Sequence, residues 1–191
     1  MRKAGLALMA YFFFDFRDSQ KQHRRDLLSS LLFQLSARSD ACHDVFSRFY
    51  SDHDEGAHQP PDDTLSKCLT DMLKVQGQPA TYIMIDALDE CPNISGTPTA
   101  REKVLQFLEH LVGLQLPNVH ICISSRPEID IQIILEPLAG FRVSLHEESG
   151  QMEDISGYVK SFVHSDRNMR RWSPDNKKLV IDALSEKADG M

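Results

Sequence analysis

Three short apolar runs, separated by segments with helical spacing, constrain the fold of this chain more than any other feature. The runs are Leu6 to Phe14, Tyr82 to Asp86 and Val119 to Ser124. A continuous apolar run such as Leu6 to Phe14 is typical of a strand that is buried on both faces, as in a parallel sheet. Alternation of such strands with helices predicts an α/β fold in which helices connect parallel strands. The length of 191 residues suits one domain, or one domain with a small appendage.

The segments between the strands predict amphipathic helices. Apolar residues recur at helical spacing in three of them. Their positions are Leu27, Leu28, Leu31, Leu32 and Leu35, then Leu65, Cys68, Leu69, Met72 and Leu73, then Val104, Leu108, Leu111 and Val112. A loop is expected from Ser51 to Pro61, and a last strand from Phe141 to Leu145.

Beyond residue 150 the pattern contains helices without strands. One apolar stripe comprises Ile155, Tyr158, Val159, Phe162 and Val163. Ser173 and Pro174 then predict a capped helix start, and Gly190 predicts its end. We therefore expect residues 1–150 to form the main domain and residues 151–191 to begin a helical subdomain.

Composition narrows the function classes. The net charge of −7 argues against a broad nucleic-acid or anionic membrane interface, and the apolar N-terminal run is too short to span a bilayer. That run could begin a secretory signal, but it lacks a small-x-small cleavage site, so a buried strand is the better interpretation. The four cysteines contain no Cys-x-x-Cys pair and predict buried thiols in a reducing compartment, so we expect a cytoplasmic protein. No zinc pattern accompanies His53 and His58.

Polar residues follow two of the predicted strands directly. Asp86 ends one strand and is followed by Asp89 and Glu90, whereas Ser124, Ser125 and Arg126 end the next. Ligands of open parallel sheets bind at the carboxyl ends of the strands. Acids beside an arginine suit a magnesium-bound polyphosphate. The alternative is that the acids only end the strand and cap its loop.

Several motifs resemble one known family. The segment "YIMIDALDEC" resembles the Walker B segment of NACHT-type ATPases, in the STAND branch of P-loop NTPases, and "ICISSRPE" resembles their sensor strand. The segment "AYFFFDFRDSQKQHRRDLLSSLLFQL" resembles the strand and helix after the phosphate loop of the fungal, nephrocystin-like members. "DISGYVKSFV" and "LSEKADGM" resemble the segment that leads out of the NACHT core. The resemblance therefore spans nearly the whole chain.

The resemblance implies a function and roles for five residues. Asp86 would hold Mg²⁺, Asp89 would be the catalytic acid with Glu90 beside it, and Ser125 and Arg126 would bind the nucleotide, Arg126 as the sensor. The cofactors implied are Mg²⁺ and ATP, in a signalling ATPase that switches self-association or the binding of protein partners. The fold implied is a three-layer α/β sheet of the P-loop (ASCE) type with strand order 5-1-4-3-2.

One family motif is absent. None of the nine glycines begins a Gly-x-x-x-x-Gly-Lys-[Ser/Thr] phosphate loop. The first strand of this chain corresponds to the family's strand 2, so the main domain would hold strands 2 to 5, and strand 1 with its phosphate loop would lie upstream of Met1. We expect such a fragment to be marginally stable, or strand 5 to close against strand 4.

Three functions remain open from the sequence. The first is part of a nucleotide-switched ATPase, which by itself would hydrolyse ATP very weakly or not at all. The second is a non-catalytic interaction module that binds a full-length partner. The third is an unrelated magnesium-dependent hydrolase, which would need a further carboxylate cluster that the sequence lacks.

Overall fold

A computed structural model of the protein describes residues 7–53, 58–94, 96–144 and 149–187, in two compact units, Met1–Ala139 and Gly140–Met191. The first unit contains the sheet, and its strands are β1 (Ala7–Phe13), β2 (Ala80–Asp86) and β3 (Val119–Ile123). Its helices are α1 (Arg24–Ser36), α2 (Asp40–Asp52), α3 (Asp62–Leu73), α4 (Ala100–Gly113) and α5 (Ile129–Leu135). Short 3-10 turns are η2 (Ser19–Lys21), η4 (Leu88–Glu90) and η5 (Glu136–Leu138).

The three strands form one parallel sheet in the order β1-β2-β3. Phe13 lies opposite Asp86, and Ile85 lies opposite Ile123. The carboxyl ends of all three strands therefore meet at one edge of the sheet. The predicted α/β class and the three predicted strands are confirmed.

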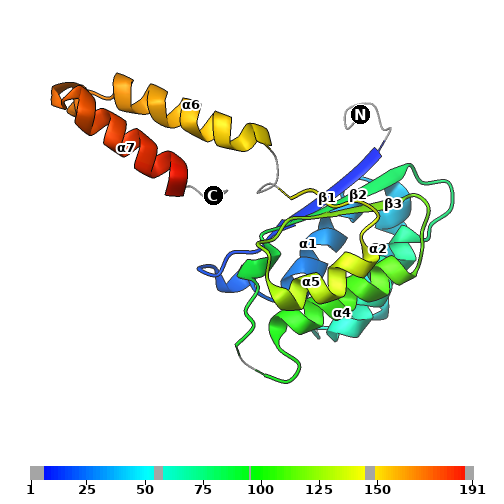
Figure 1. Ribbon diagram of the computed structural model, residues 1–191. Helices are drawn as coiled ribbons and strands as arrows, with labels where there is room; N and C mark the ends of the chain where they lie inside the picture. Colours follow the sequence, from blue (N-terminus) through cyan, green and yellow to red (C-terminus); the bar gives the residue numbers. More distant parts are fainter. Residues whose placement is uncertain (1–6, 54–57, 95, 145–148, 188–191) are drawn as a thin grey trace. The chain divides into compact units, whose positions relative to one another are not determined.

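The helices of this unit cover only one face of the sheet (Figure 1). Along β1, Leu8, Ala10 and Phe12 are buried, whereas Tyr11 and Phe13 on the other face are 38% and 51% exposed. The prediction that β1 is buried on both faces is therefore wrong. In the described part of this unit the sheet and helices make two layers, not the expected three.

The strand order explains the single helical layer. Each strand is added on the same side of its predecessor, from β1 to β2 to β3. Parallel crossover connections are right-handed, so successive crossovers that advance in one direction place their helices on the same face. Helices reach the second face only where the direction of strand addition reverses, and the described sheet contains no such reversal.

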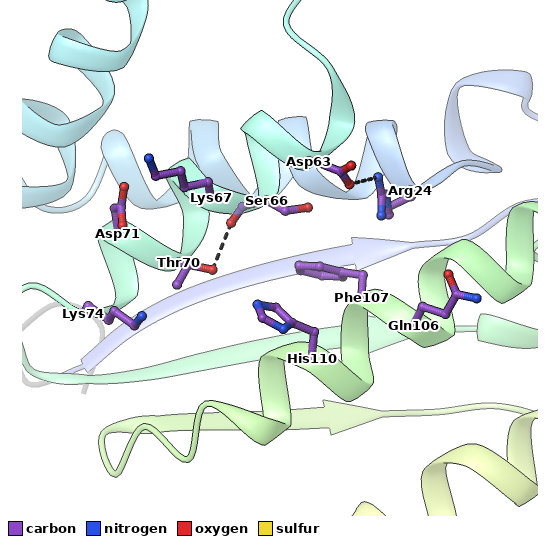
Figure 2. Close-up of a pocket in the computed structure, with 10 residues that line it drawn as sticks. All are labelled: Arg24, Asp63, Ser66, Lys67, Thr70, Asp71, Lys74, Gln106, Phe107 and His110. Carbon is purple, nitrogen blue, oxygen red and sulfur yellow. Dashed lines mark hydrogen bonds and ion pairs between the residues drawn. The ribbon is translucent and has the colours of Figure 1, made fainter.

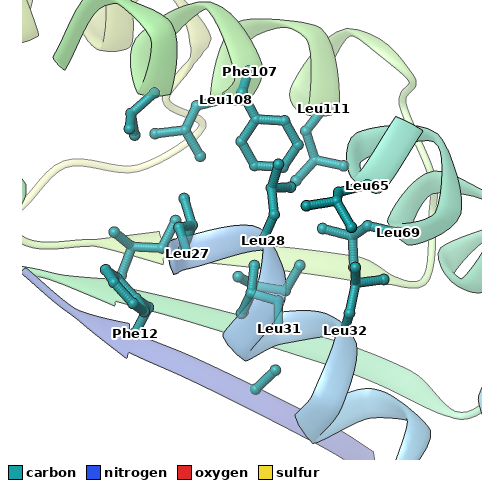
Figure 3. Packing of buried hydrophobic residues seen from close by; sticks show 14 of the residues in the cluster. Phe12, Leu27, Leu28, Leu31, Leu32, Leu65, Leu69, Phe107, Leu108 and Leu111 are labelled. Atoms are coloured by element: carbon teal, nitrogen blue, oxygen red, sulfur yellow. The ribbon is translucent and has the colours of Figure 1, made fainter. Parts of the chain in front are cut away.

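The core lies between this helical layer and the sheet (Figure 3). Five leucines of α1 are at most 1% exposed, and α1 contacts β1, α2, α3 and α4. Burial at helical spacing is what the apolar stripes predicted. The central buried residues are Leu27, Leu28, Leu31, Leu32, Leu35, Leu65, Leu69, Met72, Ile83, Ile85, Val104, Leu105, Leu108 and Leu111.

Serine and threonine side chains cap the starts of two helices. Ser39 Oγ accepts a hydrogen bond from the Cys42 amide at the start of α2. At the start of α4, Thr99 Oγ1 accepts from the Glu102 amide at 3.1 Å, and Glu102 Oε2 accepts from the Thr99 amide at 2.7 Å. This reciprocal pair is a capping box, which satisfies amides that a helix start leaves unpaired.

Side chains from α1 and from the residues just after it cover the outer edge of β1. Gln34 Oε1 accepts a hydrogen bond from the Tyr11 amide at 3.2 Å, and Gln34 Nε2 donates to the Tyr11 carbonyl at 2.6 Å. Arg38 Nη1 donates to the Met9 carbonyl. An edge strand otherwise presents unpaired backbone groups that can pair with another chain. Gln34 therefore satisfies one residue of the edge as a neighbouring strand would.

Replacement of Gln34 by leucine is expected to lower the free energy of unfolding by about 1–2 kcal/mol, because two hydrogen bonds to Tyr11 are lost and the edge is partly open to water. Urea unfolding at neutral pH measures this loss. Ser29→Ala on an exposed position of α1 is the control and should change stability by less than about 0.5 kcal/mol. Equal stability of the two variants would contradict the role of Gln34.

The predicted last strand is wrong in the described residues. Phe141 to Ser144 form no strand, and Leu145 lies outside the described residues. Phe141 and Val143 are 85% and 53% exposed. A strand needs a partner for its backbone groups, and within the described sheet β3 pairs with β2 alone. The expected closure of strand 5 against strand 4 is therefore also wrong for these residues.

The second unit contains α6 (Ser149–Ser165), the 3-10 turn η6 (Asn168–Arg171) and α7 (Pro174–Lys187). Val163 of α6 and Ile181 of α7 are buried, and the two helices contact each other. The Asn176 amide donates to Ser173 Oγ at 3.3 Å, which confirms the predicted cap. The predicted helix end at Gly190 lies outside the described residues.

Candidate functional site

Three loops meet at the carboxyl edge of the sheet. Each follows one strand, and backbone hydrogen bonds join neighbouring loops at their starts. The Phe14 amide donates to the Asp86 carbonyl at 3.1 Å, and the Leu88 amide donates to the Ser124 carbonyl at 3.1 Å. Polar residues that are far apart in the sequence are therefore brought to one edge.

Ala87 adopts a left-handed backbone conformation between β2 and η4, with φ 54° and ψ 47°. This region costs an L-residue roughly 1–2 kcal/mol, and bulky or β-branched side chains fit it worst. The turn redirects the chain so that Asp86 and Asp89 both remain at the strand end. A small residue after Asp86 therefore has a local structural reason.

Asp86 lies at the exposed end of β2 and contacts the loop after β3. The Ser124 hydroxyl donates a hydrogen bond to Asp86 Oδ1, and its oxygen accepts one from the Ala87 amide at 3.2 Å. Among the contacts of the described residues, only one carboxylate oxygen of Asp86 is engaged. The other oxygen is available to a ligand.

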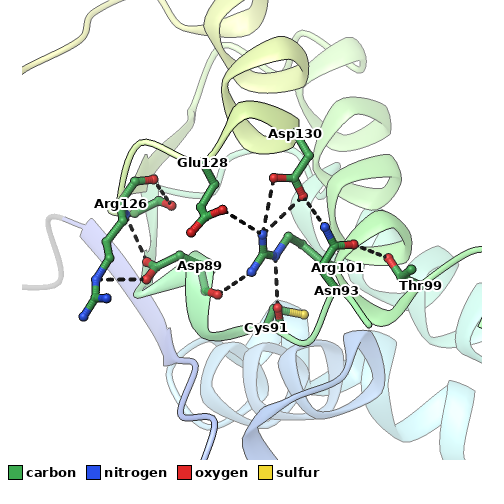
Figure 4. A network of polar contacts seen from close by, with 9 residues as sticks. Asp89, Cys91, Asn93, Thr99, Arg101, Arg126, Glu128 and Asp130 are labelled. Atoms are coloured by element: carbon green, nitrogen blue, oxygen red, sulfur yellow. Dashed lines mark hydrogen bonds and ion pairs between the residues drawn. The ribbon is translucent and has the colours of Figure 1, made fainter. Parts of the chain in front are cut away.

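Asp89 is paired with Arg126 (Figure 4). Its Oδ1 accepts a hydrogen bond from the Arg126 amide at 3.0 Å, and its Oδ2 lies 3.5 Å from Arg126 Nε. The Asp89 side chain is only 10% exposed, whereas that of Arg126 is 78% exposed. The carboxylate is thus held in place while the rest of the guanidinium extends into solvent.

Glu90 and Cys91 contact the loop after β1. Glu90 Oε2 accepts a hydrogen bond from the Phe16 amide at 3.2 Å. The buried Cys91 thiol donates to the Gln22 carbonyl at 3.2 Å, and burial raises its pKa to about 12, so the thiol stays protonated at neutral pH. These two contacts join the acidic loop to the β1 side of the site.

Asp15 adds a further negative charge to this edge. The Arg17 backbone amide donates to Asp15 Oδ1 at 2.9 Å, and the Arg17 side chain donates to the same oxygen at 3.2 Å. These contacts lower the pKa of Asp15, the backbone hydrogen bond most strongly. Asp15 is therefore ionised at neutral pH.

The predicted site residues are not all alike in position. Asp86, Asp89, Glu90 and Arg126 all lie at the carboxyl edge of the sheet, and Asp89 contacts Arg126 directly. The Ser125 hydroxyl instead donates to the Arg126 carbonyl at 2.8 Å and contacts none of the acids among the described residues. It is Ser124 that reaches Asp86.

The acids by themselves do not form a complete metal cage. Within the described residues, no group of three or more His, Cys, Asp or Glu side chains is placed to hold a metal ion. Mg²⁺ in nucleotide sites uses one or two carboxylates and takes its other ligands from water and phosphate oxygens. The open oxygen of Asp86 fits that type of site.

A separate groove lies on the helical layer (Figure 2), with a volume of about 410 Å³. Residues of α3 and α4 line most of it, with Arg24 at one end. Arg24 Nη2 pairs with Asp63 Oδ1 at 2.7 Å. The groove contains none of the predicted site residues, so it is not part of the acidic site.

Two residues of the site were not among the predicted site residues. Ser124 follows Ile123, and Ile123 lies opposite Ile85, so the strand register places Ser124 next to Asp86. Arg101 is 7% exposed and lies three residues before Val104, on the apolar face of α4. A charge within an apolar stripe was the sequence signal that could have identified it.

Comparison with known proteins gives one match. The family described as nephrocystin 3, N-terminal, matches residues 1–126 of the 191. No curated protein and no solved structure matches the chain. No helix in the described part of the chain is long and apolar enough to cross a membrane. The match covers β1, β2, β3 and the acidic loops, and the chain belongs to the nephrocystin 3 N-terminal family.

Proposed function

We propose that this chain supplies the metal-binding and sensing part of a NACHT-type nucleotide switch, in the STAND class of signalling P-loop ATPases. The observation that carries the proposal is the assembly of Asp86, Asp89, Glu90 and Arg126 at one sheet edge, with Asp89 held against Arg126. Ligands of open parallel sheets bind at such an edge.

Each residue has a role that its geometry supports. Asp86 would hold Mg²⁺, directly or through water, with its open carboxylate oxygen, while Ser124 orients the other oxygen. Asp89 would orient an attacking water, with Glu90 beside it. Arg126 would meet the negative charge of the phosphates with its exposed guanidinium. Bound Mg²⁺-ATP would supply the transferable phosphoryl group and the phosphate charges that these residues contact.

The pairing of Asp89 with Arg126 favours a resting state. One oxygen of Asp89 accepts the Arg126 amide and the other lies beside Arg126 Nε, so both oxygens contact Arg126 rather than an attacking water. A phosphate that attracts the Arg126 guanidinium would release Asp89 Oδ2. Nucleotide binding would thus change the contacts between the acidic loop and the loop before α5.

Phosphate binding requires a partner for this site. The 191 residues contain no Gly-x-x-x-x-Gly-Lys-[Ser/Thr] pattern, so the phosphate loop would come from sequence beyond these residues or from another molecule. By itself the chain is expected to hydrolyse ATP very weakly or not at all. Its metal site can nevertheless be tested directly.

The test is titration of the full chain with Mn²⁺, a paramagnetic substitute for Mg²⁺, with free Mn²⁺ measured by electron paramagnetic resonance. Asp86→Asn is expected to weaken binding by about 10- to 100-fold, because the variant removes the charged ligand. Asp175→Asn, the same change at an exposed position of α7, should leave the affinity unaltered. Identical titrations for the wild-type chain and Asp86→Asn would rule out the proposed site.

A different observation favours a second candidate, a non-catalytic interaction module. The uncovered face of the sheet exposes Tyr11, Phe13, Tyr82 and Met84 by 38%, 51%, 39% and 45%. Neighbouring exposed aromatic side chains mark surfaces that bind other proteins. A chain that binds no Mn²⁺ but co-purifies with a longer member of its family would support this function instead.

A further inference from the structure

Arg101 is a buried arginine at the start of α4. It is the second residue of the helix and is 7% exposed, with Val104 and Leu105 on the same side of the helix fully buried. A buried cation is costly unless its donors are paired and its charge is balanced. The contacts of Arg101 should therefore show why an arginine occupies an apolar position.

Two donors of Arg101 hold the backbone of the acidic loop (Figure 4). Nε donates to the Cys91 carbonyl at 3.0 Å, and Nη2 donates to the Asp89 carbonyl at 2.5 Å. The planar guanidinium presents these donors in a fixed arrangement that lysine cannot reproduce. Arg101 thus fixes the main chain of Asp89 independently of the Asp89 side chain.

The remaining nitrogen of Arg101 faces the start of α5. Nη1 lies 3.3 Å from both carboxylate oxygens of Asp130 and 3.9 Å from Glu128 Oε2. Asn93 Nδ2 also donates to Asp130 Oδ2, at 3.0 Å. The charge of Arg101 is therefore balanced by acids of the segment that follows Arg126.

These contacts close a ring. Arg101 holds the Asp89 main chain, and the Asp89 carboxylate holds the amide and Nε of Arg126. The chain then runs from Arg126 to Glu128 and Asp130, which return to Arg101. The acidic loop after β2 and the loop after β3 are thus joined at two places, and movement of one must change the contacts of the other.

We propose that Arg101 is a positioning residue that couples Asp89 to Arg126 and to α5. It keeps the Asp89 carboxylate directed at the Arg126 amide, and it links this contact to the first turn of α5 through Asp130. Its meaning for an ATPase switch rests on the proposed function, whereas the coupling itself rests on the contacts alone. Release of Arg126 from Asp89 would then be transmitted to α5.

The experiment measures amide hydrogen exchange of the full chain by NMR. In Arg101→Lys the Arg126 amide is expected to exchange about tenfold faster, because its bond to Asp89 is no longer held in place. Asp130→Asn, which weakens the far side of the ring and keeps Arg101, should accelerate the same amide in the same direction. The amides of Leu31 and Ile83 in the core should keep their wild-type rates.

A double variant separates positioning from general support. If Arg101 acts through the Asp89 carboxylate, Arg101→Lys should add no further acceleration in an Asp89→Ala background. Equal acceleration in both backgrounds, or a uniform acceleration that includes Leu31 and Ile83, would overturn the proposal. An unchanged Arg126 rate in both Arg101→Lys and Asp130→Asn would overturn it as well.

The hydrogen-exchange test of the coupling and the Mn²⁺ test of the proposed function can fail independently. A chain that binds no Mn²⁺ but shows the local, non-additive change at Arg126 retains the coupling and loses the metal site. A chain that binds Mn²⁺ through Asp86 but shows no change at Arg126 retains the metal site and loses the coupling.

Discussion

Replacement of Leu31 by alanine is expected to lower the free energy of unfolding by about 3 kcal/mol or more. Leu31 is fully buried in α1, the helix that contacts β1, α2, α3 and α4. Removal of three buried carbon atoms loses their transfer free energy and leaves a cavity, and such changes cost about 2–5 kcal/mol. The loss should lie in the upper half of that range, because the four elements that contact α1 would have to move to fill the cavity.

Urea unfolding of the full chain, followed by circular dichroism, measures this loss. Phe33→Ala is the matched control, because Phe33 lies on the same helix and is 69% exposed. It should change stability by no more than about 0.5 kcal/mol. Equal losses for the two variants would mean that α1 does not pack as described.

Ala87 is expected to respond to two substitutions with opposite signs. Ala87→Pro should lower the free energy of unfolding by about 3 kcal/mol, comparable to a proline inside a helix. Proline requires a φ near −65°, whereas the φ of Ala87 is 54°, and proline also lacks the N–H that donates to Ser124. Ala87→Gly should raise the free energy of unfolding by about 0.5–1 kcal/mol, because the strain it relieves exceeds the entropy that glycine adds to the unfolded chain.

The same urea titrations test both variants. Gln115→Gly is the control for the backbone argument, since Gln115 has φ 49° and lies just after α4, in a different loop from Asp86 and Asp89. It should gain stability by a similar amount. A loss of stability in Ala87→Gly would show that the left-handed turn after Asp86 is not the conformation in solution.

The turn at Ala87 also positions residues of the candidate site. Ala87 separates Asp86 from Asp89, and its turn directs them toward Ser124 and Arg126 respectively. A strained residue at a ligand site persists only where its surroundings hold it. Here the Ser124 hydroxyl and the carbonyl of the same residue bond the Ala87 and Leu88 amides, so the loop after β3 stabilises the turn.

Local patterns in the sequence determined most of the described elements. The stripes of leucine predicted α1, α3 and α4, and the apolar runs predicted all three strands. These predictions succeed because burial of one face repeats with the period of the element. Helix α2 was not predicted, although Cys42, Val45, Phe46 and Phe49 follow the same helical period. Helix α5 has only seven residues, too few for a clear period.

The arrangement of layers was decided by tertiary structure. The apolar run Leu6 to Phe14 predicted a strand covered on both faces, but Tyr11 and Phe13 lie on an uncovered face. The spacing and type of residues in a sequence indicate which residues are apolar. They do not indicate whether another element is present to cover those residues. The missing strand at Phe141 to Ser144 has the same cause, since a strand exists only if a neighbour pairs with its backbone.

Some features of the candidate site were likewise predictable from the sequence, and others depended on tertiary structure. The sequence by itself determined that Asp86 ends one strand and that Arg126 follows another, and hence that both lie at one edge of the sheet. Only the tertiary structure decided that Ser124, and not Ser125, contacts Asp86, and that a buried Arg101 holds the backbone of Asp89. The physical reason is that the ends of strands follow from local patterns, whereas the partner of a side chain depends on register and on loop conformation to within about one hydrogen-bond length.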